Sequence, residues 1–333
     1  MIRFARIEDV DEIMAFINKH WKAGHILATN KDFFLYELQN VDDPNQINMA
    51  IARDDKTNEL VGIDGIYYYG KRLEGRDTSG CMWKVIKSDN PVLGIDLFQF
   101  VMDNTRTRCI VGVGLGRMAI PIHKYLKFEV DVMTHWYRLN PNIKDFKIAL
   151  VTNPKIPQSS LLSQAKFVRF PHFENLNKVF DFEAYYESKS RPTKEDWYIK
   201  RRYFDHPIYT YEVFGIELNG AIKTICVFRI ESKNNAKALR FVDLIGEFEH
   251  IYYATQAIDE LLLEYNAEYV DFYEHGLDIS KMENAGWLLT KPSGNIIPNY
   301  FYPFAQENID IYYGIQDENY KVFKADGDQD RPN

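Results

Sequence analysis

The chain has 333 residues, of which 46% are hydrophobic and 15% aromatic, and its formal net charge is −8. This length exceeds that of most single domains and the apolar content suffices for packed cores, so we expect two domains and exclude a wholly disordered chain. The negative net charge argues against a general nucleic-acid surface, which needs an excess of cations to neutralise phosphates.

The cysteines Cys81, Cys109 and Cys226 lie inside apolar, strand-like runs. Their odd number and their spacing fit neither a disulfide framework nor a metal site, so we expect buried, reduced thiols and no bound metal. We expect neither a signal peptide nor membrane insertion, because no apolar run approaches the roughly 20 residues that span a bilayer. These features predict a cytoplasmic protein.

The first part of the chain alternates between strand and helix patterns. Helices are predicted where apolar residues recur at helical spacing, and a hairpin where turn-forming residues join two strands. In chain order we predict a strand at Ile2–Arg6, a helix after Glu8-Asp9, a loop at His20–Asn30, a helix at Phe33–Leu38, and a hairpin of Asn48–Arg53 with Leu60–Tyr69.

Next come two strand–loop–helix units. In the first, the apolar run Cys81–Ile86 leads through the polar turn Ser88–Gly94 into an amphipathic helix at Ile95–Met102. In the second, the run Cys109–Leu115 precedes a helix that starts at Gly116. A loop between a strand and a helix presents unpaired backbone N–H groups and the positive end of the helix dipole, which suits a pyrophosphate.

Strands are then predicted at Val130–Tyr137 and Phe146–Val151, and the proline-containing segment Asn153–Ser160 predicts a linker. After the linker the element order partly recurs, so we expect a second domain of the same fold; a single large α/β domain with a coincidental repeat is the alternative. The recurring elements are a helix at Trp197–Tyr203, a hairpin about Asn219-Gly220, a strand at Leu239–Ile245, helices at Tyr253–Tyr265 and Ser280–Ala285, a strand at Glu268–Tyr273, and closing strands within Asn299–Ile315.

The order β-α-α-β-β-β-α-β-α-β-β, with Gly94 in the first polar turn and Lys87 before it, resembles the GNAT superfamily of acyl-CoA-dependent acetyltransferases. The resemblance implies an α/β fold of tandem GNAT domains, each with a mixed, mostly antiparallel central sheet flanked by helices. The implied ranges are 1–152 for an acyl-CoA-binding domain, 153–170 for a linker, and 171–333 for a second domain with an acceptor-binding role and an acidic tail.

The same resemblance implies where coenzyme A binds. Its pyrophosphate is expected on the first polar turn, and the acyl carbonyl on a backbone N–H of the preceding strand. In the second half the equivalent turn is Gly246–His250, whose two carboxylates repel a pyrophosphate, so we expect only the first domain to bind coenzyme A. The expected coenzyme-contacting residues are Val85, Ile86, Lys87, Asn90, Val92, Leu93, Gly94 and Ile95.

The stretches Asn18–Leu27, Arg202–Tyr211 and Phe323–Asn333 resemble a narrower group. This group is the two-domain GNAT-type N-acyltransferases that modify nucleotide-linked amino sugars, such as dTDP-linked 3-amino-3,6-dideoxyhexoses, for bacterial surface polysaccharides such as the O-antigen of lipopolysaccharide. The resemblance implies transfer of an acetyl or short hydroxyacyl group from acyl-CoA to the sugar amine. Residues expected to contact the nucleotide sugar are Trp21, His25, Tyr203, His206, Tyr209 and Arg331.

Candidates for moving protons follow from the same resemblance. Matching Leu126 and Phe128 to the GNAT pattern Tyr-x-x-Leu-Gly-Phe places His123 where these enzymes carry the tyrosine that protonates the departing thiolate. A histidine titrates near neutrality and suits that role. The carboxylates of Asp326 and Asp328 are candidates for receiving the ammonium proton. Structural roles, as a helix-packing histidine and a disordered acidic tail, stay open for both sets.

Other functions also stay open. A tandem-GNAT aminoacyl or peptide acyltransferase of cell-wall assembly uses a tRNA donor, which an acidic chain without a basic stripe binds poorly. A non-catalytic coenzyme A-binding module fits the glycine-poor turn. The sequence leaves undecided the acyl group, the sugar, the nucleotide, and whether the chain forms an oligomer.

Overall fold

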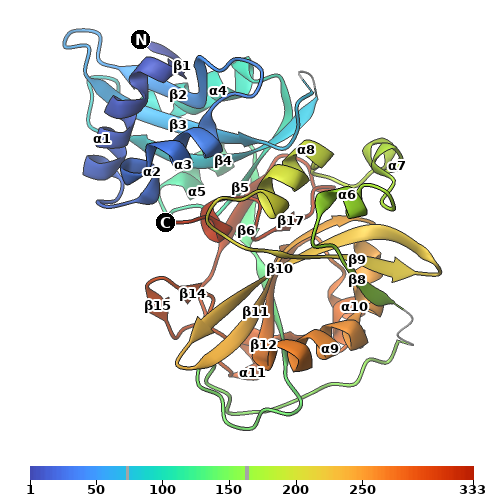
Figure 1. Cartoon of the computed structure of the whole chain (residues 1–333). Coiled ribbons are helices and arrows are strands. Elements are labelled where there is room, and N and C mark those ends of the chain that lie inside the picture. Colours follow the sequence, from blue (N-terminus) through green and yellow to red (C-terminus); the bar gives the residue numbers. More distant parts are fainter. Residues whose placement is uncertain (73–74, 162–164) are drawn as a thin grey trace. The chain divides into compact units, whose positions relative to one another are not determined.

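The computed structural model describes residues 1–72, 75–161 and 165–333, and the chain divides into two compact units (Figure 1). Unit 1 comprises Met1–Val130, Gly314–Asp317 and Asp326–Asn333, and unit 2 comprises Asp131–Tyr313 and Glu318–Ala325. The boundary expected at residue 152 therefore lies inside unit 2. The acidic tail expected in the second domain belongs to unit 1.

Unit 1 is built on a mixed sheet with the strand order β1-β2-β3-β4-β5-β16-β6. The pairs from β1 to β4 are antiparallel, and β4 and β5 are parallel. The strands are β1 (Ile2–Arg6), β2 (Gln46–Arg53), β3 (Leu60–Tyr68), β4 (Arg76–Val85), β5 (Thr107–Val113), β6 (Glu129–Val132) and β16 (Tyr312–Ile315); the helices are α1 (Val10–His20), α2 (Ile26–Thr29), α3 (Lys31–Leu38), α4 (Leu93–Asn104) and α5 (Ala119–Tyr125).

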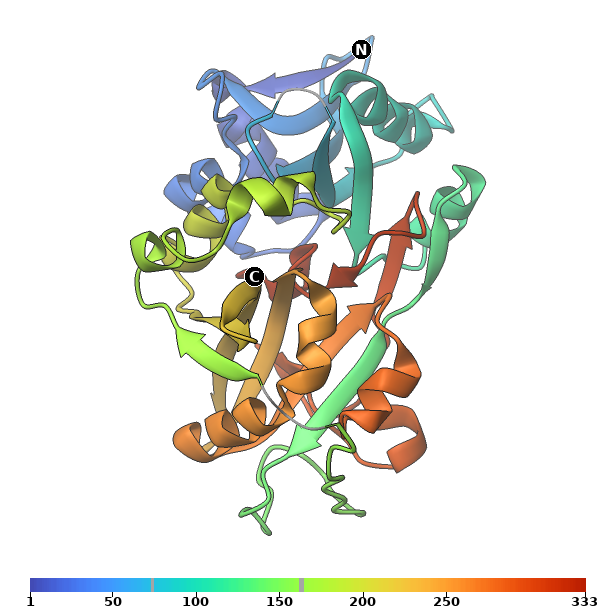
Figure 2. The same cartoon turned by 90° about the vertical axis from the view of Figure 1, so that its right-hand side faces the viewer.

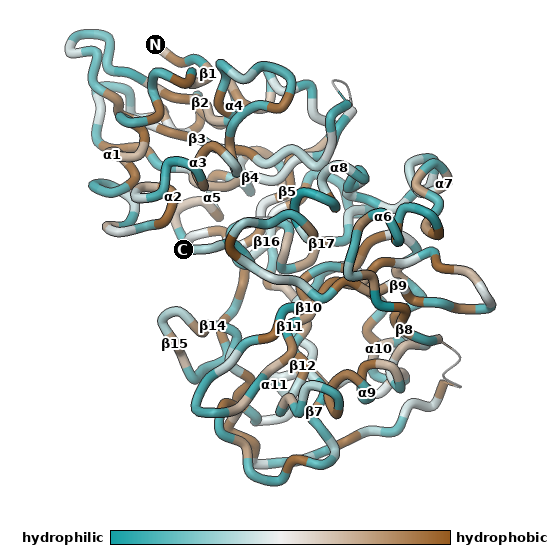
Figure 3. Tube along the Cα trace, viewed as in Figure 1, coloured by the Kyte–Doolittle hydropathy of each residue, from teal (hydrophilic) through white to brown (hydrophobic). Residues whose placement is uncertain are grey.

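Helices cover both faces of this sheet. Their apolar residues recur at helical spacing, so each helix has one apolar side that packs on the sheet. Val10, Ile13 and Ile17 of α1 are buried in one core with the apolar side chains of α3 and one face of the sheet. Leu97 and Val101 of α4 are buried in a second core on the opposite face. In Figure 3 apolar brown follows β2 and β3, whereas the loop between these strands is hydrophilic teal.

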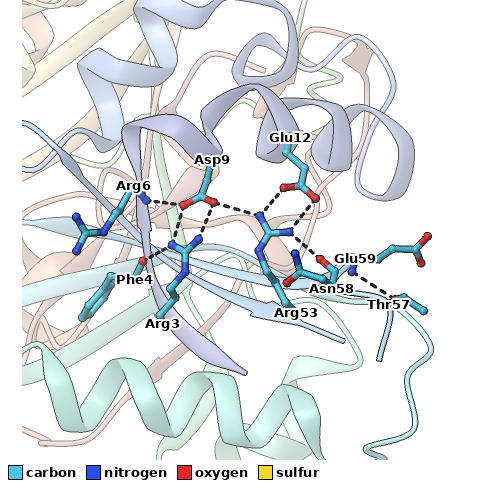
Figure 4. Close-up of polar contacts among 9 residues, drawn as sticks. All are labelled: Arg3, Phe4, Arg6, Asp9, Glu12, Arg53, Thr57, Asn58 and Glu59. Atoms are coloured by element: carbon cyan, nitrogen blue, oxygen red, sulfur yellow. Dashed lines mark hydrogen bonds and ion pairs between the residues drawn. The ribbon is translucent and has the colours of Figure 1, made fainter. Parts of the chain in front are cut away.

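A network of arginines and carboxylates fastens β1 to α1 and β2 (Figure 4). The Asp9 carboxylate accepts hydrogen bonds from the Arg3 guanidinium at 2.7 and 2.8 Å, from Arg6 N at 2.8 Å and from Arg53 Nη2 at 3.1 Å. Burial raises the pKa of Asp9, but these donors outweigh burial and lower the pKa to about 2. Asp9 is therefore ionised at neutral pH.

Unit 2 is built on a second mixed sheet with the strand order β13-β7-β12-β11-β10-β9-β8, and β17 pairs with β12. The strands are β7 (Thr134–Leu139), β8 (Lys166–Arg169), β9 (Glu212–Leu218), β10 (Ala221–Lys233), β11 (Ala236–Gly246), β12 (Ala267–His275), β13 (Leu288–Leu289), β14 (Tyr300–Phe301), β15 (Phe304–Ala305) and β17 (Val322–Phe323). The α-helices are α6 (Phe173–Leu176), α7 (Phe182–Glu187), α8 (Asp196–Ile199), α9 (Thr255–Tyr265), α10 (Ile279–Asn284) and α11 (Thr290–Ser293).

Strand pairing explains why the expected domain boundary is displaced. β7 pairs antiparallel with β12 over Thr134–Leu139, so this segment belongs to the sheet of unit 2 (Figure 2, green beside orange). The second half of β16, from Gly314, and the last eight residues, Asp326–Asn333, belong to unit 1. Pairings between segments so far apart in the chain have no local sequence signal.

The predictions of hairpins, which depend on local turn-forming residues, were more successful. The hairpin of β2 with β3 is confirmed, and so is the hairpin about Asn219-Gly220, where both turn residues have positive φ. A strand at Phe146–Val151 was wrong. The Glu268 carboxylate accepts hydrogen bonds from the backbone N–H groups of residues 147–149, and only Leu150 forms an isolated bridge, to Ile296.

The expected linker 153–170 contains β8, and its residues 162–164 lie outside the described residues. Within the described ranges, no helix is both long enough and apolar enough to cross a membrane. Cys109 and Cys226 are buried cysteines outside any disulfide, and Cys81 is a partly buried one.

Candidate active site

The parallel strands of unit 1 part from each other at a defined point. β4 and β5 pair from Arg76–Thr107 to Ser79–Val111, and β4 then continues to Val85 without β5. At the same level the pairing of β4 with β3 shifts register, which marks a β-bulge opposite Gly65. Among the described residues, no strand pairs with this edge of β4 beyond Ser79.

The turn that follows β4 leads into the first turn of α4. Asn90 organises this turn: its Oδ1 accepts from Val92 N at 3.0 Å, and its Nδ2 donates to Asp96 Oδ2 at 2.7 Å. Ile95 N donates to Val92 O at 2.8 Å, and Leu93 N donates to Asn90 O at 3.3 Å. Val92 is exposed, whereas Leu93 is buried in the core.

Crowding by neighbouring side chains does not explain why residue 94 is a glycine. A Cβ placed on it would make ordinary contacts, at 3.5 Å from Val85 Cγ2 and 3.6 Å from Trp83 Cζ2. The absence of a side chain instead allows a ligand to approach the backbone at the positive end of α4 closely. The carboxylate of Asp96 in the same turn opposes an anionic ligand.

The residues at the end of β4, which were expected to bind the acyl carbonyl, differ in whether their backbone N–H is available. Ile86 N donates to Val61 O at 2.9 Å and is not available to a ligand. Val85 is the last residue of β4, opposite Gly62, and Lys87 is exposed beyond the strand end. Roles for Val85 and Lys87 stay predictions.

His123 lies on α5 within an aromatic cage. Its ring centroid is 5.8 Å from Trp83, 5.2 Å from Phe98 and 5.0 Å from Phe128, and the residue is 4% exposed. Nδ1 lies 2.9 Å from Ala119 O, so Nδ1 carries the proton and donates to that carbonyl. A Cβ on Gly112 of β5 would lie 3.6 Å from Nε2, which places this nitrogen beside the strand that parts from β4.

This geometry revises the chemistry expected of His123. Burial lowers the pKa of the ring, and the hydrogen bond to Ala119 only partly opposes that effect. The ring is therefore neutral near pH 7 and presents a lone pair at Nε2. Such an imidazole must first accept a proton at Nε2 before it can donate one to a thiolate.

Trp83 connects the predicted coenzyme turn to the predicted catalytic histidine. Its indole contacts the position of Gly94 on one side and the ring of His123 on the other. Trp83 and Phe98 were not predicted as site residues from the sequence. In the sequence, Trp83 is an aromatic residue within a strand pattern, and Phe98 is one on the apolar side of a predicted helix. Ordinary core residues give the same patterns.

The C-terminal residues Asp326–Asn333 are an ordered part of unit 1 rather than a free tail. Asp326 is fully buried and accepts a hydrogen bond from the Tyr69 hydroxyl at 2.8 Å. Asp328 is partly buried and accepts from the Tyr67 hydroxyl at 3.3 Å. A Cβ on Gly327 would lie 2.5 Å from Val113 O at the end of β5, so the backbone passes that strand closely.

Asp328 has a perturbed titration. Burial raises its pKa to about 6, and the nearby Arg331 and the Tyr67 hydroxyl only partly offset this. A carboxylate with a pKa near the working pH suits proton transfer. Arg331 forms a buried ion pair with Glu37, and its guanidinium lies 3.5 Å from the centroid of the Tyr67 ring. That pairing gives Arg331 a structural role within unit 1, whereas its contact with a nucleotide stays a prediction.

Trp21 and His25 of unit 1 were also predicted to contact the acceptor sugar. Trp21 directly follows α1, and His25 directly precedes α2. His25 is buried and caps α2: its Nδ1 accepts from Leu27 N at 3.2 Å. Burial, with a smaller contribution from Lys22, lowers the pKa of His25 to about 4, so a role as a proton acceptor is disfavoured. Trp21 is 44% exposed. A contact of either residue with the acceptor stays a prediction.

The predicted acceptor residues of unit 2 differ in accessibility. Tyr203 is buried, and its hydroxyl donates to Asp243. His206 Nδ1 accepts from Ile208 N at 3.1 Å and Tyr209 N at 2.9 Å, and the His206 ring stacks on Tyr209 with centroids 5.5 Å apart. His206 and Tyr209 are only partly buried, so they are the better placed of these residues to meet a ligand.

Unit 2 has a parallel pair of its own, but its own chain fills the space that opens. β11 and β12 pair through Phe241–Phe272, and beyond that point β17 pairs with β12 at Glu274–Phe323. Ala325 N donates to Val242 O of β11 at 3.0 Å, which joins the segment to both strands. At the equivalent turn, a Cβ on Gly246 would lie 2.2 Å from Lys223 O, so this glycine serves the close approach of β10.

In the described part of the chain, no cluster of His, Cys, Asp and Glu residues has the makings of a metal site. No protein-family model matches the sequence, and no curated protein matches it.

Solved structures do match the fold. A GCN5-related N-acetyltransferase from Anabaena variabilis ATCC 29413 has a TM-score of 0.53 at 12% identity, and the match covers 95% of this chain and 72% of that one. A conserved protein from Enterococcus faecalis V583, described as a probable N-acyltransferase, has a TM-score of 0.52 at 6% identity and covers 94% and 71%.

A third match is a GCN5-related glucosamine N-acetyltransferase region of a fungal multi-domain GH3 beta-N-acetylglucosaminidase. Its TM-score is 0.50 at 12% identity, and the match covers 95% of this chain and 38% of that one. At these identities the similarity establishes the fold alone: the chain has the mixed α/β fold of GCN5-related N-acetyltransferases, as the element order predicted.

Proposed function

We propose that this protein is an enzyme, an acyl-CoA-dependent N-acyltransferase whose donor binds unit 1. The observation that carries the proposal is the separation of β4 from β5 after Ser79, directly before the α4 turn and beside His123. A strand edge without a partner offers backbone groups to an extended chain such as pantetheine, and the positive end of the α4 dipole at Gly94 favours a pyrophosphate.

For the acceptor we propose the amine of a nucleotide-linked amino deoxysugar, which receives an acetyl or short hydroxyacyl group. The stretches around His25, His206 and the C-terminus support this acceptor by their resemblance to such enzymes. The glucosamine N-acetyltransferase region among the structural matches shows that a protein with this fold acts on an amino sugar. The partly buried His206 and Tyr209 supply a stacked aromatic surface of the kind that contacts sugar and base faces.

The reaction needs a neutral amine and a proton for the departing thiolate. We assign the ammonium proton to the carboxylate of Asp328, whose pKa of about 6 leaves it ionised at neutral pH. The amine nitrogen then bonds to the thioester carbon and the carbon–sulfur bond breaks. The proton lost from the nitrogen passes to Nε2 of His123 and from there to the thiolate, so the proton count balances.

Unit 2 contributes no coenzyme site in this proposal. The strand β17 occupies the place beside β12 where a pantetheine chain would lie, and Glu247 and Glu249 flank the equivalent turn. We therefore assign unit 2 to recognition of the acceptor. Carboxylates near a pyrophosphate would weaken binding by charge repulsion.

Thiol release from acetyl-CoA and from a short hydroxyacyl-CoA tests the proposal. The enzyme is incubated with dTDP-, UDP- and GDP-linked amino sugars, and the proposal expects release that depends on one of these acceptors. Coenzyme A binding without release under any condition would support a non-catalytic coenzyme-binding module instead. Release with an aminoacyl or peptide acceptor, but with no sugar, would favour the cell-wall type of acyltransferase.

A further inference from the structure

Two buried polar groups on adjacent strands of unit 1 have no hydrogen-bond partner among the described residues. They are Asp64 Oδ2 on β3 and Trp83 Nε1 on β4. Asp64 is 2% exposed. Buried polar atoms are nearly always paired in folded proteins, and unpaired ones reduce stability, so two on neighbouring residues require an explanation.

The two side chains share one face of the sheet. Asp64 lies directly opposite Trp83 in the antiparallel register, and opposed residues in such a pair point to the same side. The β-bulge of β4 begins at this pair, between Asp64–Trp83 and Ile66–Gly80. Bulges re-aim side chains and are common beside active sites.

Trp83 places this pair at the candidate active site. A Cβ on Gly94 would lie 4.0 Å from Trp83 Cε2, the ring atom bonded to Nε1, and the same indole contacts the His123 ring. The indole N–H therefore lies near the predicted coenzyme turn. An indole nitrogen is only a donor, so the group that completes it must be an acceptor.

The Asp64 carboxyl can also act as a donor, in its protonated form. Its neighbours on this face include the apolar Ala50, and no charged group in the described part of the chain offsets its burial. Burial raises the pKa of the Asp64 carboxyl well above its ordinary value, which favours the protonated form. A neutral carboxylic acid in an apolar site is an effective hydrogen-bond donor to a developing oxyanion.

We propose that Trp83 Nε1–H and the Asp64 carboxyl donate hydrogen bonds to the carbonyl oxygen of the acyl thioester. The inference rests on the proposed function, since it assigns the acyl group of that donor. As the amine bonds to the carbonyl carbon, an electron pair moves to the oxygen, and the two donors stabilise its charge. The pair returns when the carbon–sulfur bond breaks, and neither residue gains or loses a proton.

Matched variants test the donors separately. Trp83→Phe removes the N–H and keeps an aromatic ring, and it is expected to lower kcat by roughly 10²–10³-fold, as loss of one oxyanion donor does. Asp64→Leu is expected to lower kcat by a similar factor, whereas Asp64→Asn, which retains an N–H donor, is expected to stay within about ten-fold of the wild type. The control is Trp287→Phe in unit 2, another buried indole whose Nε1 has no partner among the described residues; this variant is expected to keep the wild-type kcat.

Binding and stability measurements separate this role from a structural one. In calorimetry the wild type is expected to bind acetyl-CoA more tightly than coenzyme A, because only the former has the acyl carbonyl. The Trp83→Phe variant is expected to lose this difference, with unchanged affinity for coenzyme A itself. Asp64→Leu is expected to raise the melting temperature while it lowers kcat, because it removes an unpaired polar group from an apolar site. A merely structural residue would not give that combination.

Two results would overturn the proposal, and they are distinguishable. If both variants keep kcat within about three-fold of the wild type, the two atoms only hold a buried water, and the proposed function stands without them. If the wild type neither binds acetyl-CoA nor releases thiol, the proposed function fails and takes the inference with it.

Discussion

The buried ion pair of Arg331 with Glu37 predicts a large loss of stability when one partner is removed. Their side chains are 6% and 4% exposed, and Arg331 also lies over the Tyr67 ring. Arg331→Met leaves the Glu37 carboxylate without this cation, which costs about 3–5 kcal/mol, and it removes a cation–π contact worth about 1–2 kcal/mol. Against a total stability of about 5–15 kcal/mol, this change brings unit 1 close to unfolding.

Urea unfolding followed by circular dichroism measures the loss. The double variant Arg331→Met/Glu37→Leu is expected to recover most of it, because two apolar residues replace the pair and leave no buried charge. Lys22→Met is the matched control: Lys22 makes an exposed contact with Asn333 at 2.8 Å, so its loss is expected to change stability by no more than about 0.5 kcal/mol. If Arg331→Met loses under about 1 kcal/mol and instead raises the KM of the acceptor, Arg331 is a ligand-binding residue and the structural interpretation is wrong.

The remaining predictions concern the coenzyme turn and the proton path. Gly94→Asp is expected to fold normally, because a side chain there meets only ordinary contacts, and to weaken acetyl-CoA binding by about tenfold or more in calorimetry through charge repulsion; an unchanged affinity would place the pyrophosphate elsewhere. His123→Phe is expected to lower kcat and kcat/KM together by roughly 10²–10⁴-fold with little change in coenzyme A affinity, and wild-type rates would make His123 a packing residue only. Because the pKa of Asp328 is raised to about 6, the folded state binds its proton more tightly than the unfolded state, so this group's stabilisation is complete below about pH 4 and is lost as pH rises through 6. Asp328→Asn is therefore expected to gain about 1–3 kcal/mol over the wild type at pH 8 but not at pH 4, the lower bound allowing for partial exposure; equal pH profiles in urea unfolding would exclude the shift.

Sequence patterns predicted the elements that depend on short-range chemistry. The apolar spacing and polar turn before α4 located that helix to within two residues at each end, and Asn219-Gly220 located the hairpin of β9 with β10. These features depend on contacts a few residues apart, which periodicity and turn residues encode directly.

The features that the sequence analysis missed depend on long-range register. β17 enters the sheet of unit 2 beside β12, and Asp326 meets Tyr69 across 257 positions of the chain. The pairing of Asp64 with Trp83 likewise follows from the alignment of β3 with β4 and from a bulge. In the sequence, Asp64 is one acidic residue in an apolar run. That its Oδ2 has no hydrogen-bond partner among the described residues is visible only in three dimensions.

Hydrogen–deuterium exchange of the full chain, with and without acetyl-CoA, tests the central claim most directly. The account predicts slower exchange of amides at Asn90–Leu97 and along the end of β4, with no change at Gly246–His250 of unit 2. Protection at Gly246–His250, or no protection anywhere at saturating acetyl-CoA, would contradict the assignment of the coenzyme site to unit 1.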